Sequence, residues 1–301
     1  MIRNKVTLKQ IEALVFVADL GTFRKAATAL GTTQPNVSVR IAALEDTLKT
    51  VLMHRDAGSV QLTDKGRAVV AAARTVLRST EALLEVADRR DLIDEKLRLG
   101  VTELVASTWL HSYLRMLRQT YPALRVELIV DLSVEIEKHL SAGQIDLAIL
   151  TGPTRNSAFA SVSLGSYRYG WVASETISNS LGPRPDFARV FAHGLMSHGK
   201  HTLASRSLRR HLLDERLSPD EVVHSSSLTA LRHMAADGMG VALLPRQLYT
   251  ADLAAGRLYE VDCSWVAAPL DFSSCFHKDR STLYIEKAAD LAMQAAQSAR
   301  E

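Results

Sequence analysis

A short segment early in the chain carries four polar side chains that could read the edges of DNA bases. Glutamine and asparagine amides pair with adenine through two hydrogen bonds, and the guanidinium of arginine pairs in the same way with guanine. Pro35 sits among them; we interpret it as structural, although its ring could contact a thymine methyl group. Each polar side chain could instead belong to a solvated helix face. The four are Gln34, Asn36, Ser38 and Arg40.

Six further residues around this segment suit contacts with a phosphate backbone. Hydroxyl and cationic side chains bind phosphate oxygens, which position a protein on a duplex without specifying its sequence. The charge distribution supports this interpretation, because residues 1–90 hold 14 Lys and Arg against 9 Asp and Glu, whereas the remainder holds 22 against 24. The six are Thr22, Arg24, Lys25, Thr33, Arg55 and Thr63.

A second group of hydroxyl residues lies where predicted strands end and helices begin. Ligands of open α/β lobes bind beyond the carboxyl ends of the strands, near helix N-termini whose N–H groups attract anions. Each hydroxyl could be a simple helix cap, but their convergence favours a small organic anion, such as an aromatic carboxylate. Trp109, His198 and His201 could add stacking or charge. The hydroxyl residues are Thr102, Ser107, Thr108, Ser133, Ser226 and Ser227.

Three predicted helices position the first polar segment. The apolar spacing predicts helices over residues 7–19 and 22–30, and a third that begins at Gln34-Pro35, where proline suits a first turn. Gly31 separates the second helix from the third, and Thr33 is the expected N-cap. A polar, basic helix that follows another after about three residues is the helix-turn-helix arrangement. Its buried face would consist of Val37, Ile41, Leu44 and Leu48.

A wing and a long helix are expected next. Residues 55–63 predict a small β-hairpin, and residues 64–88 a helix whose Val70, Leu77 and Leu84 recur every seven residues. Such a stripe favours pairing between two chains, although it could instead pack on its own subunit.

From residue 97 the pattern alternates between strands and helices. Strands are expected at 97–101, 126–130 and 147–150, with helices at 108–120 and 134–141. A second set comprises a strand at 169–173, a looser stretch to about 218, a helix at 228–237 and strands at 241–244 and 270–276. This alternation predicts two α/β lobes with a cleft between them.

Composition narrows the class of protein. At 301 residues the chain has room for about two domains. It contains no run of about 18 apolar residues and none after Met1 that resembles a signal peptide, and two cysteines are too few for a disulfide framework. We therefore expect a cytoplasmic protein.

Taken together, these residues resemble the LysR-type transcriptional regulators, in the family's order and over essentially the whole chain. The N-terminal motifs are Phe23-(x)2-Ala26-Ala27-(x)2-Leu30, Gln34-Pro35-(x)2-Ser38, Leu44-Glu45, Arg55 and Leu62-Thr63-(x)2-Gly66. The C-terminal motifs are Leu97-Arg98-Leu99-Gly100, Tyr121-Pro122, Gly143 to Ile149 and Gly238 to Pro245. Departures at Thr22, Leu48-Lys49 and Leu52-Met53-His54 change turn and wing detail but leave the polar helix intact.

The resemblance implies a multi-domain fold: a winged helix-turn-helix, mainly α, at 1–63; a linker helix that dimerises at 64–94; and a two-lobed α/β effector domain, like periplasmic binding proteins, at 95–301. Lobe I would take about 95–168 and 268–301, and lobe II about 169–267. It places a small-molecule inducer between the lobes, with Thr151, Gly152, Ser197 and His198 opposite the other hydroxyls. The implied partners are a dyad-symmetric double-stranded DNA site, a second copy of the chain in a homodimer and then a homotetramer, and RNA polymerase.

Other readings have weaker support. Cys263 and Cys275 could form a redox sensor on the same architecture, although the sensing cysteines of peroxide-responsive relatives lie earlier in the domain. A phosphate loop at residues 194–201 lacks the Ser or Thr that would hold magnesium, and a metal site at His193, His198 and His201 lacks a nearby Cys or carboxylate. No nucleophile motif with an orienting partner is present, so we predict neither an enzyme nor a cofactor. A small-molecule-binding protein without DNA contact is the alternative from another class.

Overall fold

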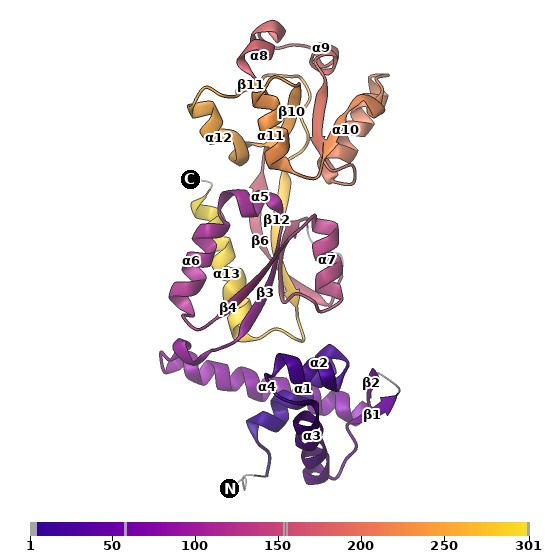
Figure 1. The fold of residues 1–301 in the computed structure, drawn as a ribbon, viewed down its shortest axis with the longest axis vertical. Coiled ribbons are helices and arrows are strands. Elements are labelled where there is room, and N and C mark those ends of the chain that lie inside the picture. The colour runs from indigo at the N-terminus through magenta and orange to yellow at the C-terminus, as the bar shows by residue number, and fades with distance from the viewer. Residues whose placement is uncertain (1–4, 57–58, 153, 155, 300–301) are drawn as a thin grey trace. The chain divides into compact units, whose positions relative to one another are not determined.

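The N-terminal part of the chain is a group of three helices and a two-stranded wing (Figure 1). The computed structural model describes residues 5–56, 59–152, 154 and 156–299. The N-terminal elements are α1 (Leu8–Leu20), α2 (Phe23–Ala29), α3 (Gln34–Leu48), β1 (Met53–Asp56) and β2 (Ser59–Leu62). The predicted helix-turn-helix is confirmed, with Gly31 at a φ of 58° in the turn between α2 and α3. Of the predicted hairpin tip, residues 57 and 58 lie outside the described part.

The buried sides of α1, α2 and α3 meet in one apolar core. Val37 and Ile41 are fully buried, and Leu44 is almost so, as the spacing predicted. Leu48, which we expected on the same face, is 39% exposed. Leu48 is the last residue of α3, directly before Lys49 turns into the left-handed region at a φ of 52°. It therefore lies at the very end of the helix, outside the core.

The long helix α4 (Asp64–Val86) begins at the wing. Thr63 caps it, because its Oγ1 accepts the N–H of Gly66 at 2.8 Å and donates to the carbonyls of Val51 and Leu52. A Cβ on Gly66 would lie 1.9 Å from the Leu52 carbonyl oxygen, so only glycine allows this close approach.

The apolar stripe of α4 is used within the chain at its start. Val70 and Ala73 are buried in the N-terminal core, and Leu77 packs against them. The stripe that we assigned to pairing between chains therefore packs, over this part, on its own subunit. A different row, with alternating spacings of four and three residues, faces solvent: Ala72, Val76, Ser79, Leu83 and Val86.

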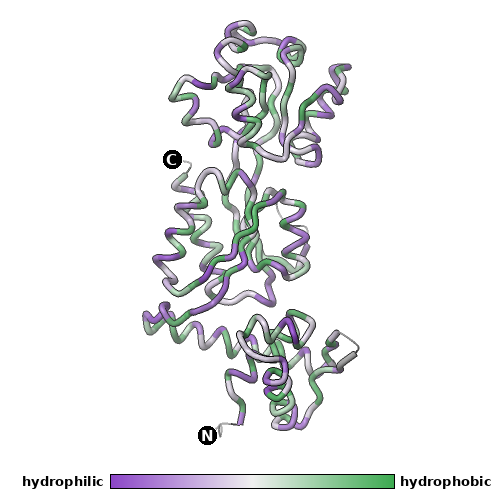
Figure 2. The backbone as a smooth tube through the Cα atoms, viewed as in Figure 1, coloured by the Kyte–Doolittle hydropathy of each residue, from purple (hydrophilic) through white to green (hydrophobic). Residues whose placement is uncertain are grey.

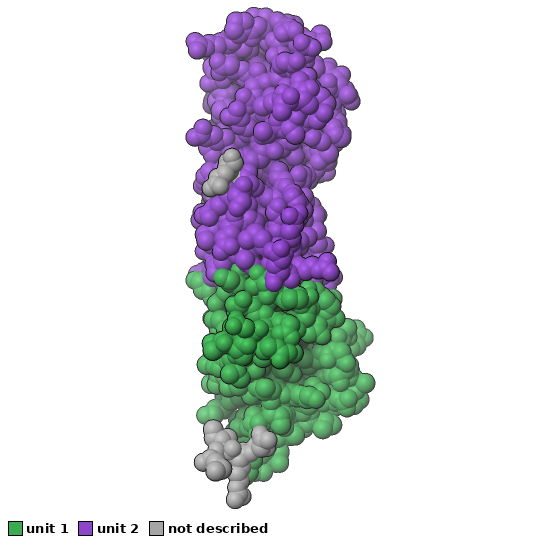
Figure 3. Space-filling model, turned by 90° about the vertical axis from the view of Figure 1, so that its left-hand side faces the viewer, with its two compact units in different colours: residues 1–96, 120–125, 277–287 green, residues 97–119, 126–276, 288–301 purple. Residues whose placement is uncertain are grey.

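A compact unit of residues 1–96, 120–125 and 277–287 contains the whole of α4 (green in Figure 3). Within it, polar side chains of α4 contact the later segments. Arg78 donates to both carboxylate oxygens of Glu286 at 2.7 and 3.1 Å, Glu81 accepts the N–H of Leu283 at 2.6 Å, and Glu85 accepts the hydroxyl of Tyr121 at 2.7 Å.

The second unit, purple in Figure 3, holds two five-stranded sheets. One sheet has the order β4-β3-β5-β12-β6, with β3 and β5 parallel and β12 antiparallel to β5. Its strands and helices are β3 (Lys96–Val101), α5 (Glu103–Thr108), α6 (Leu110–Thr120), β4 (Arg125–Val130), α7 (Ser133–Ser141), β5 (Leu147–Thr151), β6 (Phe159–Tyr167), β12 (Leu270–His277) and α13 (Leu283–Ser298). A short 3-10 helix, Arg90–Leu92, precedes β3.

The other sheet has the order β11-β7-β10-β8-β9, in which β8 is parallel to both neighbours and β7 is antiparallel to β10. Its elements are β7 (Tyr169–Ala173), α8 (Glu175–Leu181), α9 (Phe187–Ala192), β8 (Leu195–His198), α10 (Leu203–Asp214), η2 (Pro219–Glu221), β9 (Val223–Ser225), α11 (Leu228–Ala236), β10 (Val241–Pro245), α12 (Arg246–Ala254) and β11 (Tyr259–Val261). The stretch to residue 218 that we predicted as loose is thus three helices and a strand.

The two α/β lobes agree with the predicted fold class, and hydrophobic residues follow their inner strands (Figure 2). The chain passes between the sheets twice, directly from β6 to β7 through residue 168, and back between β11 and β12. We refer to the first sheet with its helices as lobe I and to the second as lobe II.

The pKa of Glu81 generates a prediction about stability. Burial raises it to about 7, outweighing the N–H of Leu283. The native state therefore holds this proton more tightly than the unfolded chain. The stability that results is complete below the ordinary glutamate pKa, about 4.3, and is lost as the pH rises through about 7. Between pH 4.5 and 8 we expect the wild type to lose about 2 kcal/mol of unfolding free energy relative to Glu81→Gln, a discounted value because the side chain is partly exposed.

Urea unfolding of both proteins at several pH values measures this difference. Glu85→Gln, one turn later, is the matched control. Burial raises the pKa of Glu85, but hydrogen bonds from Tyr121 and Arg90 and the Arg90 charge lower it further, to a net value below the ordinary one. The difference in unfolding free energy between Glu85→Gln and the wild type should stay constant above pH 5. A wild-type curve parallel to that of Glu81→Gln would contradict the prediction.

Candidate nucleic-acid interface and effector cleft

The polar face of α3 points away from the core that holds the helix. Gln34, Pro35 and Asn36 are exposed, and Ser38 and Arg40 are half-buried. Thr33 is the N-cap residue, as predicted, but its side chain makes no capping hydrogen bond, so its hydroxyl remains exposed. The first two turns of α3 therefore present amide, hydroxyl and guanidinium groups to solvent.

Two details of this face did not follow from the sequence. Val39 is 67% exposed in the second turn of α3, where a branched apolar side chain could contact a thymine methyl group. We assigned no role to Val39 from the sequence; its helical spacing relative to Val37 and Ile41 was the available signal. Arg40 lies near Glu12 of α1. Burial raises the pKa of Glu12, and the Arg40 charge acts to lower it.

Some of the residues expected to contact phosphates have exposed side chains, and others already make hydrogen bonds within the fold. Arg24 and Lys25 are exposed on the first turns of α2. Thr22 caps that helix, its Oγ1 accepting the N–H of Lys25 at 3.2 Å. Thr63 is the cap of α4, and its hydroxyl proton is committed to the carbonyls of residues 51 and 52. Arg55 lies on β1, and its side chain is outside the described part of the chain.

Lobe I holds six of the residues predicted for the cleft. Thr102, directly after β3, is 8% exposed, and its hydroxyl has no hydrogen-bond partner among the described residues. Ser133 Oγ and Thr151 Oγ1 lie 2.8 Å apart, and Ser133 also accepts the Thr151 N–H at 3.0 Å. The α7 start and the β5 end therefore meet, as the topology predicted. Ser107 and Thr108 lie at the end of α5 rather than at a helix start, because α5 begins at residue 103.

Gly152 follows β5 with a φ of 80°, and its N–H donates to the Asp271 carbonyl at 2.7 Å. Its backbone donor is therefore used within the fold.

Lobe II places three of its four predicted residues, His198, Ser226 and Ser227, around the N-terminus of α11. Ser227 is the cap, its Oγ accepting the N–H of Ala230 at 3.1 Å, and Ser226 is exposed beside it. His198 contacts the Ser226 carbonyl through Nε2 at 3.0 Å, and burial lowers the pKa of this imidazole. Ser197 is 1% exposed, with its Oγ 2.8 Å from that of Ser205. Ser197 is thus a satisfied buried hydroxyl below the surface.

Sequence reasoning missed Glu103, a residue of lobe I that contacts the start of α11 in lobe II. Its Oε1 accepts the Ser227 hydroxyl at 2.9 Å and the Thr229 N–H at 3.1 Å, and its Oε2 accepts the Leu228 N–H at 2.6 Å. The available signal was an acidic residue directly after β3, to which we assigned no role from the sequence.

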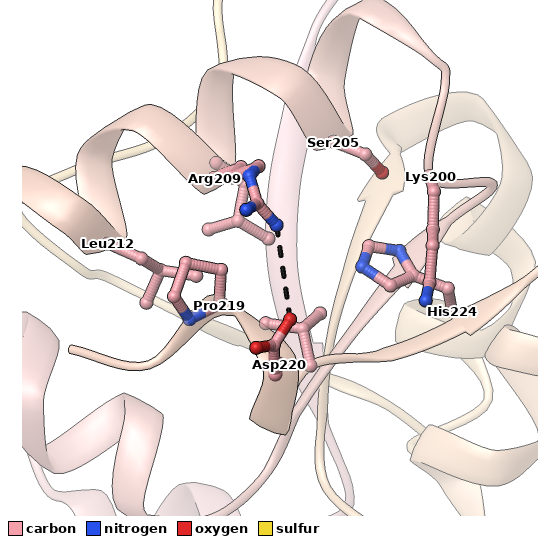
Figure 4. A pocket seen from close by; sticks show the side chains of 9 residues that line it. Lys200, Ser205, Arg209, Leu212, Pro219, Asp220 and His224 are labelled. Carbon is pink, nitrogen blue, oxygen red and sulfur yellow. Dashed lines mark ion pairs between the residues drawn. The ribbon is translucent and has the colours of Figure 1, made fainter.

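A cavity in lobe II lies elsewhere, between α10 and β9 (Figure 4). It has a volume of about 70 Å³ and includes Lys200, Arg209 and His224, with Arg209 4.0 Å from Asp220. None of the residues predicted for the cleft lines it.

The two cysteines lie in different cores. Cys275 is fully buried in lobe I, and burial raises its thiol pKa to about 11. Cys263 packs against the lobe II core, and both thiols are free. Within the described ranges, no group of three His, Cys, Asp or Glu side chains is placed to hold a metal ion. No described helix is long and apolar enough to span a bilayer.

Comparison with known proteins places this geometry in a family. The profile of the bacterial regulatory helix-turn-helix protein, lysR family, matches residues 8–67, and that of the LysR substrate binding domain matches residues 90–297. A hydrogen peroxide-inducible genes activator of Pectobacterium carotovorum subsp. carotovorum is 30% identical over 251 residues, which cover 80% of each chain.

Solved structures share the fold. Full-length LysG from Corynebacterium glutamicum with bound effector Arg aligns with a TM-score of 0.61 at 19% identity, over 97% of this chain and 99% of that one. Full-length CbnR complexed with its target DNA aligns with a TM-score of 0.52 at 19% identity, over 97% of this chain and 100% of that one. The chain belongs to the LysR-type family of DNA-binding transcriptional regulators, with an N-terminal helix-turn-helix and an effector-binding domain, and is not an enzyme.

Proposed function

We propose that α3 enters the major groove of a dyad-symmetric promoter site and that a small organic anion bound between the lobes controls this binding. The observation that carries the proposal is the division of α3 into two faces. Val37 and Ile41 anchor it, while Gln34 and Asn36 stand exposed on the first turn. Recognition helices read bases with the residues of their first turns.

Positioning would come from the flanking side chains. Arg24 and Lys25 stand exposed on α2, the helix that crosses the backbone in this arrangement. Neutralised phosphates release counterions, so binding should weaken steeply as salt rises.

The partner proposed for α4 is a second copy of the same chain. The solvent-facing row contains Leu83, which is 66% exposed, and Val86, which is 87% exposed, and its spacing is the heptad spacing of a coiled coil. Val70 and Leu77, on the opposite side of the helix, hold it to its own domain. Two readers joined in this way would match a site with dyad symmetry.

A further surface favours assembly beyond the dimer into the homotetramer. β4 is an edge strand of lobe I, and alternate residues along it, Val126, Leu128 and Val130, are 38–47% exposed. An exposed apolar edge favours association with another chain.

The effector proposal rests on the hydroxyls and N–H groups that the two lobes bring toward α11. The LysG structure contains Arg, a small molecule that itself carries a carboxylate, which supports a ligand of this size. RNA polymerase is the partner that such a regulator would affect.

The redox alternative has less support, although a relative is named for hydrogen peroxide. Oxidation by peroxide needs a thiolate that is accessible and has a low pKa. The raised pKa and full burial of Cys275 oppose both requirements, and Cys263 belongs to another core.

The DNA proposal predicts different defects for two positions. Asn36→Ala should cost about 1–3 kcal/mol on the chain's own upstream duplex and less on scrambled DNA, because it removes base contacts. Arg24→Ala should weaken both equally and reduce the salt slope by about 1. Gel retardation across a salt series measures these effects, with the exposed Arg206→Ala of lobe II as control. Unchanged discrimination in Asn36→Ala would argue that α3 does not read the sequence.

The dimer proposal predicts that Leu83→Glu separates the chains. A charge would be buried twice across a symmetric seam, so the dimer Kd should rise at least about a hundredfold, or about 2.7 kcal/mol. Sedimentation analysis measures it. Ala71→Glu introduces the same charge at an exposed position off the row and should leave the Kd unchanged. Equal dimer Kd values for Leu83→Glu and Ala71→Glu would exclude this row as the dimer interface.

The case against redox sensing predicts that Cys275 resists modification. At pH 7.5 a thiol of pKa about 11 is thiolate in roughly one molecule in several thousand, so native alkylation should be at least about a hundredfold slower than for a free cysteine. Mass spectrometry of iodoacetamide-treated native protein, with urea-unfolded protein as the reference, follows the rate. Rapid modification of Cys275 by millimolar peroxide would restore the redox alternative.

A further inference from the structure

The N-terminus of α11 in lobe II already holds a carboxylate that comes from lobe I. Glu103 belongs to the first turn of α5, and α5 packs against α11 and α12. Its two oxygens accept three hydrogen bonds, from the Ser227 hydroxyl and from the N–H groups of Leu228 and Thr229. Every one of these donors belongs to the start of α11.

Helix chemistry explains why an acidic side chain occupies this position. The first N–H groups of a helix have no acceptor within it, and the helix dipole adds positive charge there. α11 is nine residues long, and the free N–H groups of its residues 228 and 229 point to Glu103. Burial raises the pKa of Glu103, but these hydrogen bonds outweigh it, so that the net pKa lies below the ordinary value. The carboxylate is held in its charged form.

The surroundings are those of the predicted effector cleft. Thr102, adjacent to Glu103, has a buried hydroxyl without a partner among the described residues. His198, across on lobe II, is close enough for the Glu103 charge to act on its imidazole, raising the pKa against the larger effect of burial. The groups that would receive the carboxylate of a ligand are therefore the ones that receive Glu103.

We propose that Glu103 is a built-in competitor of the effector: it joins the two lobes through the α11 N-terminus, and an anionic effector binds by displacing it. This inference rests on the proposed class of effector. Displacement exchanges an intramolecular carboxylate for one from the ligand, so the contact between α5 and α11 is released as the ligand is gained. The apparent affinity for the anion is reduced by the fraction of molecules in which Glu103 has left the site.

Amide hydrogen exchange of the full chain tests the contact itself. In Glu103→Gln, and to a lesser degree in the shorter Glu103→Asp, exchange at Leu228 and Thr229 should be at least about tenfold faster than in the wild type. Glutamine keeps only one acceptor oxygen and no charge, and aspartate is one methylene too short to reach both N–H groups with the same geometry. Glu175→Gln removes an exposed carboxylate from the first turn of α8 and should leave both amides unchanged. Unchanged exchange in both Glu103 variants would overturn the proposal.

Calorimetric titration with benzoate tests the competition. Glu103→Gln should bind benzoate at least about tenfold more tightly than the wild type and Glu175→Gln. Equal affinity in all three would overturn competition while leaving an anionic effector in place. If no variant binds benzoate while amides 228 and 229 still exchange faster in Glu103→Gln, the link between the lobes stands, but competition and the proposed effector class both fail.

Discussion

The burial of one stripe of α3 is the constraint on which the DNA-binding end of this protein depends. Val37, Ile41 and Leu44 are removed from water by α1 and α2, and a helix held by one side must present its other side outward. The amides of Gln34 and Asn36 are consequently exposed in the protein without DNA. Close packing of Ala26, which is fully buried, lets the helices approach closely enough for this.

Helix α4 makes two different sets of contacts, one apolar and one polar. Its first half is fixed to the reader domain by Val70 and Ala73, and its polar residues Arg78 and Glu81 are held by the segment that precedes and opens α13. These two sets of contacts occupy adjoining sides of the helix and leave a third side, with Leu83 and Val86, exposed. A displacement of the first residues of α13 would therefore act on α4, the helix that packs against the helix-turn-helix.

Sequence periodicity was sufficient for the helix-turn-helix, the wing and the existence of two α/β lobes, but not for α8, α9, β8 and α10, which lie in the stretch predicted as loose. It failed where a choice depends on distant residues. The heptad of Val70, Leu77 and Leu84 is as regular as the exposed row, and only packing against α1 separates them. Likewise, nothing local distinguishes Ser197, which Ser205 satisfies in the interior, from Ser226, which stays exposed. The role of Glu103 depends on residues 124 to 126 positions away in the chain.

The prediction at the cleft rested on the principle that a helix N-terminus at a domain junction attracts an anion. At α11 the chain itself supplies a carboxylate, that of Glu103. An N-terminus satisfied by a neighbouring lobe stabilises one arrangement of the lobes, and a solute can shift the arrangement only through a difference in its affinity for the two states. A ligand that takes the place of Glu103 has such a difference by construction, because it binds well only where the internal carboxylate has withdrawn. Ligand recognition and movement of the lobes would then be one chemical exchange at the start of α11.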